Sequence, residues 1–131
     1  ENKNKEINKI IDMQKKKTGK LFNFCLYAVG VLANKTYKEK LFLSNLGEEI
    51  GLLFQLADDF LDIKSSEKLA GKLVKKDQKK GKSTLLKSMG EKKAHLYAFH
   101  LKKKILLKLK KHGKKGMNLI NTIEFILERN F

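Results

Sequence analysis

Several residue types are missing or rare in this chain of 131 residues, which has no proline, no tryptophan, one cysteine and one arginine. Without proline, no residue obliges a helix to end or kink, so long uninterrupted helices are expected. The single cysteine, Cys25, excludes an intrachain disulfide. Its position in an apolar run, residues 21–32, predicts a buried free thiol.

Long apolar segments are missing as well. The longest candidate, residues 21–33, is shorter than the roughly 20 residues that span a bilayer, and it contains Asn23. It also starts late in the chain and lacks the small-residue cleavage pattern of a signal peptide. We therefore expect no transmembrane segment and a cytoplasmic location.

Negative charge is scarce, since 14 acidic residues face 30 basic ones and leave a formal net charge of +16. Arg129 is the only arginine, so almost all of the positive charge is lysine. Specific readers of nucleic acid rely on the planar fork of arginine, so this bias argues against a specific nucleic-acid partner. A basic helical module that binds polyanions or a membrane surface stays open as an alternative, on residues 101–111. The interpretation we prefer for that segment is an outer bundle helix with one buried stripe.

Helical periodicity is what the chain does contain, within a length that suits one domain, residues 1–131. In the first half we expect a weakly amphipathic helix (1–17), a break at Thr18 and Gly19, a central helix that is apolar on most sides (21–32), a connection (34–37) and a helix (38–63). In the second half we expect a long loop (64–82), a helix cap at Ser83 or Thr84, a cationic helix (91–112) ended by Gly113 and Gly116, and a short last helix (117–129). The apolar positions expected in the cationic helix include Leu96, Phe99, Ile105, Leu106 and Leu109. The fold class is therefore all-α, with about five helices.

Three of the five aspartates fall within five consecutive residues, as Asp58, Asp59 and Asp62. On a helix Asp58 and Asp62 share a face one turn apart, and Asp59 stands about 100° round from Asp58. Clustered carboxylates destabilise a semi-buried helix end unless a cation lies among them. Mg²⁺ prefers such oxygens and keeps sites open for phosphate, so the pattern predicts Mg²⁺ that holds a diphosphate. An exposed acidic patch that answers the surrounding lysines is the alternative.

Cations and a hydroxyl flank this acidic cluster in the sequence. Lys17 and Thr18 lie upstream at the expected helix break, and Lys72 and Lys82 lie downstream in the expected loop. A P-loop is excluded around Gly81–Thr84. The pattern needs a glycine five residues before Gly81, where this chain has Lys76, and no strand precedes the segment. The three histidines have no spacing typical of a zinc site.

Four blocks of the sequence together resemble the trans-isoprenyl diphosphate synthases, most closely the bacterial farnesyl diphosphate synthases. The run from Gly51 to Asp62 is similar to the second aspartate-rich motif of that family, and Lys17-Thr18-Gly19 to its Lys-Thr-Gly block. The segment 71–85 resembles its phosphate loop, and residues 125–130 resemble its C-terminal end. The resemblance implies an isoprenoid synthase helical bundle, of which this chain is the C-terminal portion.

The resemblance also implies a Mg²⁺-dependent condensation of isopentenyl diphosphate with an allylic diphosphate, dimethylallyl or geranyl diphosphate, to give farnesyl diphosphate. Complete members of the family are commonly homodimers. By the family pattern, the metal ligands are Asp58, Asp59 and Asp62; the diphosphate-binding lysines are Lys17, Lys72 and Lys82; and Gln55 and the Thr18 carbonyl face the developing carbocation, with Lys17 and Thr18 counted among the catalytic residues.

The first aspartate-rich motif of the family, and the arginines that follow it, are missing from this chain. The only aspartate before Asp58 is Asp12. We therefore expect the chain alone to be inactive and to expose apolar faces that the missing helices would cover. Synthesis of geranylgeranyl or longer polyprenyl diphosphates, and an inactive fragment or subunit, stay open as alternatives.

Overall fold

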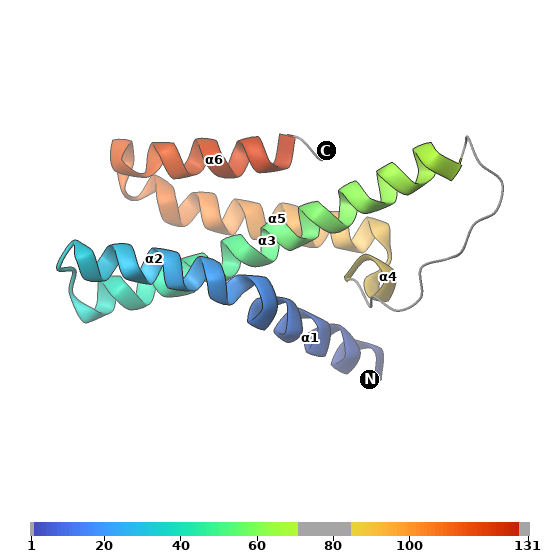
Figure 1. The fold of residues 1–131 in the computed structure, drawn as a ribbon, viewed down its shortest axis with the longest axis horizontal. Helices are drawn as coiled ribbons and strands as arrows, with labels where there is room; N and C mark the ends of the chain where they lie inside the picture. Colours follow the sequence, from blue (N-terminus) through green and yellow to red (C-terminus); the bar gives the residue numbers. More distant parts are fainter. Residues whose placement is uncertain (1, 71–84, 129–131) are drawn as a thin grey trace.

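The computed structural model of the chain describes residues 2–70 and 85–128, and every element in these two parts is helical (Figure 1). The elements are α1 (Asn2–Gln14), the π-helical turn η1 (Lys15–Gly19), α2 (Lys20–Leu32), α3 (Tyr37–Ala70), α4 (Leu85–Met89), α5 (Glu91–Lys110), the 3₁₀ turn η2 (Gly113–Gly116) and α6 (Met117–Glu128). The all-α prediction is confirmed. No helix in the described parts combines the length and the apolar character needed to cross a membrane.

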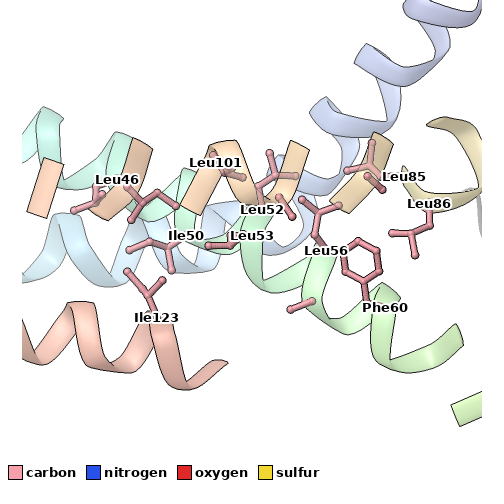
Figure 2. Packing of buried hydrophobic residues seen from close by; sticks show 14 of the residues in the cluster. Leu46, Ile50, Leu52, Leu53, Leu56, Phe60, Leu85, Leu86, Leu101 and Ile123 are labelled. Atoms are coloured by element: carbon pink, nitrogen blue, oxygen red, sulfur yellow. The ribbon is translucent and has the colours of Figure 1, made fainter. Parts of the chain in front are cut away.

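The centre of the bundle is α3, which contacts α1, η1, α2, α4, α5 and α6 (Figure 1). Among the described helices it supplies the largest share of the core, and Leu52, Leu53, Leu56 and Phe60 point toward the neighbouring helices (Figure 2). Ile123 of α6 packs into the same cluster, and so do the side chains that α4 and α5 contribute, Leu85, Leu86 and Leu101. The residues directly before and within the aspartate cluster therefore sit on the most firmly packed helix of the chain.

The apolar character of residues 21–32 predicted a helix at the centre of the bundle. The helix in this position, α2, does not lie there. Among the described elements only α3 and η1 contact α2, which lies at the edge of the bundle. Leu21, Phe24 and Leu32 are exposed, and Cys25 is exposed as well, so the prediction of a buried thiol is wrong. The physical reason is that a helix buries only the side that meets a neighbour, and α2 meets one long helix.

Two further expectations are corrected. Residues 64–70, expected to open a long loop, continue α3 to Ala70. In α5 the expected residues Ile105 and Leu109 are buried, whereas Leu96 and Phe99 are exposed, and the face toward the core is completed by Ala94, Ala98 and Leu101. The small alanines permit a close approach of α5 to the core, which the larger residues would prevent. As predicted, α5 ends before Gly113, which has a φ of 56°.

Candidate functional site

The three clustered aspartates lie near one another on α3 but in different surroundings. Asp59 is buried, with 6% of its surface exposed, whereas Asp58 and Asp62 are exposed. Leu56, Ala57 and Phe60 are buried around them and hold this stretch of α3 against the core. One carboxylate is thus fixed inside the protein, and the other two face outward beside it.

Gln55 connects two of these carboxylates to a residue far away in the sequence. Its amide nitrogen Nε2 donates to Asp59 Oδ1 at 3.3 Å and, more weakly, to Asp58 Oδ2 at 3.5 Å. Its carbonyl oxygen Oε1 accepts a hydrogen bond from Thr18 Oγ1 at 3.0 Å. Both ends of the amide are therefore used, which fixes the orientation of the side chain. The network of Thr18, Gln55, Asp58 and Asp59 joins η1 to α3.

Close backbone contact brings Thr18 to Gln55. A Cβ added to Gly51 would lie 2.7 Å from the Cα of Gly19, and one added to Gly47 would lie 2.4 Å from the carbonyl oxygen of Phe22. Neither distance is possible for a real side chain, so the contact requires glycine at Gly47 and Gly51. Gly51 was recognisable in the sequence only as part of a motif, and its packing role depends on the fold.

Polar and aromatic contacts support the same helix pair. Glu48 Oε1 accepts from Lys20 Nζ at 2.6 Å and from Asn23 Nδ2 at 3.1 Å. The rings of Phe22 and Phe54 lie 5.6 Å apart between their centroids. Sequence reasoning missed the roles of Glu48 and Asn23. The available signal was Asn23 itself, an uncharged polar residue within an otherwise apolar helix.

The electrostatics of Asp59 differ from those of an ordinary surface aspartate. Burial raises the pKa of Asp59, and the nearby charges of Asp58 and Asp62 raise it further, while hydrogen bonds from Gln55 and the backbone N–H of Leu85 oppose the shift. Its second oxygen, Oδ2, is buried and has no hydrogen-bond partner within residues 2–70 and 85–128. A buried acceptor without a donor is costly, so this oxygen is suited to a bound cation.

The bond from Leu85 shows where the chain returns after α3. Leu85 begins α4, and its backbone N–H is directed at the Asp59 carboxylate. The residues between Ala70 and Leu85, which include Lys72 and Lys82, lie outside the described residues. Lys17 is described and exposed, next to Thr18 in η1. The structure thus brings together Thr18, Gln55 and the aspartates, and it leaves the placement of Lys72 and Lys82 undescribed.

The described residues suit a shared magnesium site better than a closed metal cage. Within residues 2–70 and 85–128, no three His, Cys, Asp or Glu side chains come close enough together to hold one ion. Mg²⁺, however, is usually held by one or two carboxylates together with water and the phosphates of a substrate. The free oxygen of Asp59 and the exposed carboxylate of Asp58 fit that arrangement, with Asp62 one turn further along α3.

Three comparisons place the chain among known proteins. The chain is 34% identical over 84 residues to the farnesyl diphosphate synthase of Bacillus subtilis, which covers 64% of this chain and 28% of the relative. It is 34% identical over 118 residues to the geranylgeranyl diphosphate synthase of Cyanophora paradoxa, which covers 87% of this chain and 38% of the relative. The crystal structure of an isoprenoid synthase family member from Thermotoga neapolitana matches 93% of this chain and 40% of that chain, with a TM-score of 0.73 and 27% identity.

The chain therefore spans between about a quarter and two-fifths of the length of these relatives. The isoprenoid synthase fold expected from the sequence is confirmed over nearly the whole chain. The family model of the polyprenyl synthetases matches residues 1–123, and the chain belongs to that family.

Proposed function

We propose that this chain is the C-terminal part of a prenyltransferase domain that joins isopentenyl diphosphate to an allylic diphosphate. The observation that carries the proposal is the network in which Thr18 and Gln55 meet a buried aspartate, Asp59, whose Oδ2 has no partner in the part of the chain that the structure describes. Family membership supports the reaction class. Dimethylallyl and geranyl diphosphate are the proposed allylic substrates, and farnesyl diphosphate is the proposed product.

In this proposal, each residue has a role that follows from its surroundings. Asp58 and Asp59, supported by Asp62, hold Mg²⁺, which when bound neutralises charge on the diphosphate. Lys17 binds the same group. Lys82 precedes Leu85 by only three residues, and Leu85 contacts Asp59. Three residues of chain reach at most about 11 Å, which favours Lys82 as a further diphosphate ligand. Lys72 is proposed as another because the segment 71–85 resembles the family's phosphate loop.

The neutral polar groups act where positive charge develops. As the allylic C–O bond breaks, the electron pair leaves with the diphosphate and the allylic carbon becomes cationic. The double bond of isopentenyl diphosphate then forms the new C–C bond, and a proton leaves the adduct. The Gln55 amide oxygen and the Thr18 carbonyl can stabilise the cation without reacting with it. The hydrogen bond from Thr18 Oγ1 orients the Gln55 carbonyl.

The product length is the least constrained part of the proposal. The relatives include a farnesyl and a geranylgeranyl diphosphate synthase at the same 34% identity. A longer product therefore stays an alternative. We further propose that the 131 residues alone are inactive, because they span only part of the relatives, and that the complete enzyme is a homodimer.

Calorimetry with inorganic pyrophosphate or dimethylallyl diphosphate, with and without Mg²⁺, tests the site. We expect binding that requires Mg²⁺ and that is lost when Asp58→Ala and Asp59→Ala are combined. The matched control is Asp12→Ala, because Asp12 is an exposed aspartate on α1 whose partner is Lys16 at 2.8 Å. Binding that survives the double substitution, or that is equal without Mg²⁺, would show that the metal-site proposal is wrong.

The contacts of α5 argue against the alternative that this chain is only a basic helical module that binds polyanions or a membrane surface. Lys104 and Lys108 contact Glu49 of α3 at 2.9 and 2.7 Å, so part of the lysine-rich stretch is engaged in ion pairs between α5 and α3. Leu101, Ile105 and Leu109 of the same helix are buried. These contacts favour an outer bundle helix with one buried stripe. Salt-dependent DNA binding would not separate the two functions, because almost any chain of this charge shows it.

A further inference from the structure

The outer side of α5 is used neither by the core nor by the candidate site. The inner side of this helix is buried in the bundle and consists of Ala94, Ala98, Leu101, Ile105 and Leu109. Three large apolar side chains of the same helix lie in solvent instead, since Leu96 is 57% exposed, Phe99 60% and Leu107 55%. At about 100° of rotation per residue, these three lie on the side of α5 opposite the buried one.

Lysines alternate with these apolar residues along the same side of the helix. We define the outer stripe of α5 by six exposed residues: Lys92, Leu96, Phe99, Lys103, Leu107 and Lys110. Successive members are 4, 3, 4, 4 and 3 residues apart, so all six fall within about 80° of arc. The stripe runs for about five helical turns, or roughly 27 Å. It is therefore a straight surface strip in which apolar and cationic side chains are interleaved.

The outer stripe lies in a segment without negative charge. Residues 92–123 contain no Asp or Glu, whereas residues 92–115 contain ten lysines. Of these lysines, Lys104 and Lys108 pair with Glu49 of α3. The remaining lysines of the segment form no ion pair with a described residue. Their positive charge is therefore available to an anionic partner from outside the bundle.

The interleaving decides between the possible partners. A protein that covered the stripe would bury Lys103 and Lys110 among apolar side chains, which is costly unless each lysine meets a carboxylate. A second copy of this chain would bring two positive surfaces together. Nucleic acid would pair with the lysines but leave Leu96, Phe99 and Leu107 without apolar contacts. At an anionic bilayer, lysines meet headgroup phosphates while apolar side chains enter the acyl boundary, so both kinds of residue are satisfied.

We propose that the outer stripe of α5 attaches this protein to the surface of a bilayer that contains anionic phospholipids. The helix lies parallel to the membrane plane, with Phe99 and Leu107 in the acyl boundary and Lys103 between them at the phosphates. In this proposal α5 stays an outer bundle helix with one buried side, and the membrane contact is a property of its other side. The inference goes beyond the proposed function and does not rest on it, because no residue of the stripe belongs to the candidate site.

Sedimentation with vesicles tests whether this stripe, and not the overall charge of +16, carries the binding. The probes are vesicles of phosphatidylcholine alone and vesicles of equal parts phosphatidylcholine and phosphatidylglycerol, and we expect the 131-residue chain to bind only the second kind. Leu96→Ser combined with Phe99→Ser keeps the charge and should weaken that binding about tenfold. The matched control on α2 is Leu21→Ser combined with Phe24→Ser, at side chains that are 63% and 67% exposed, and it should leave the binding unchanged.

Two pairs of lysines separate local charge from overall charge. Lys103→Gln combined with Lys110→Gln should weaken vesicle binding about 25-fold, at about fivefold for each lysine near an anionic surface. Lys5→Gln combined with Lys9→Gln removes the same charge from exposed positions of α1, which has no contact with α5 among the described elements, so salt should screen most of its effect. Circular dichroism checks that every variant folds. Equal losses from the two lysine pairs, or from the two serine pairs, would overturn the proposal.

The absence of tryptophan from the chain allows a direct measurement of insertion. The emission of Phe99→Trp should shift to the blue on vesicles that contain phosphatidylglycerol and should be quenched there by brominated phosphatidylcholine. Phe24→Trp on α2 is the matched reporter and should keep the emission of a solvent-exposed ring. A solvent-exposed emission from Phe99→Trp on these vesicles, or equal quenching of Phe24→Trp, would show that the stripe does not enter the membrane.

The other partners give distinct results with the same reporter. A blue shift of Phe99→Trp that appears without vesicles as the protein concentration rises would overturn the proposal in favour of a second copy. A shift with duplex DNA but none with vesicles would overturn it in favour of nucleic acid. Vesicle binding should persist when Asp58→Ala and Asp59→Ala are combined, and its loss would overturn this inference. A chain that binds vesicles but no diphosphate would refute the proposed function alone.

Discussion

The packing of α2 and η1 on α3 makes a sharp prediction at Gly47. A Cβ at this position would lie 2.4 Å from the carbonyl oxygen of Phe22, 2.6 Å from its carbonyl carbon and 2.7 Å from the Cα of Asn23. All three atoms belong to the backbone of α2, which cannot rotate away as a side chain can. Gly47→Ala must therefore push the two helices apart.

The size of the effect follows from two opposing contributions. Overpacking of a tight contact costs about 1–3 kcal/mol. Alanine in place of glycine within a helix returns about 1 kcal/mol of stability. Because the clash at Gly47 is with backbone, we expect the upper part of the range and a net loss of about 1–2 kcal/mol. For a chain of this length, that loss lowers the melting temperature by roughly 3–8 °C.

Gly30→Ala is the matched control. It changes the helix propensity in the same way, but its Cβ would meet the side-chain atoms Leu43 Cδ1 at 3.0 Å and Lys40 Cγ at 3.1 Å. These atoms belong to flexible side chains that can move aside, so stability should stay equal or rise by up to about 1 kcal/mol. Urea unfolding followed by circular dichroism measures both variants. If Gly47→Ala were as stable as Gly30→Ala, the close backbone contact and the placement of Thr18 that follows from it would be refuted.

Three other changes have expected outcomes. Asp59→Asn should raise the melting temperature at neutral pH, because it removes a buried charge on a carboxyl group whose pKa is raised. In thermal scans this advantage of the variant should disappear as the pH falls through the raised pKa toward the pKa of an unfolded aspartate, near 4. Thr18→Val should lower the free energy of unfolding, measured in urea, by about 1 kcal/mol, because it removes the hydrogen bond to Gln55. Thr18→Ser keeps the hydroxyl and should keep that stability. Although burial opposes it, hydrogen bonds and charges from Lys108 and Lys104 hold the pKa of Glu49 below its usual range. The stability that Glu49 contributes should therefore be present above about pH 4 and lost below it, and Glu49→Gln should flatten that part of the pH profile of unfolding.

The helical class and the burial of an apolar stripe along α3 could be predicted from the sequence, because both depend on local spacing, whereas the centre of the bundle was expected at residues 21–32. Leu46, Ile50 and Leu53 recur at the helical period and are buried. The start and end of α5 and the start of α6 were also predictable, since glycines mark these boundaries. Periodicity could not reveal which of two apolar faces has a neighbour, and for that reason Cys25 and Phe24 were assigned to the interior.

The candidate site, too, could be predicted from the sequence only in part. The aspartates could be found from their clustering, and Thr18 and Gln55 from the resemblance to a family. The hydrogen bond between Thr18 and Gln55, which lie 37 residues apart, required the structure, because it depends on a backbone approach at Gly19 and Gly51. The Asp59 oxygen that has no partner among the described residues likewise depends on packing that no local pattern records.

The π-helical turn η1 gives the exposed lysines around it an unexpected constraint. A π turn holds one more residue than an α-helical turn would, and here it lies between two otherwise regular helices. Removal of one residue from this turn would leave an ordinary α-helical turn in its place, so α1 and α2 would keep nearly the same relative orientation. One residue added to the turn would instead rotate one helix relative to the other by about 100°, and Thr18 would face away from Gln55 or the contacts of α1 would be lost. This polar surface segment should therefore tolerate the loss of one residue far better than the gain of one.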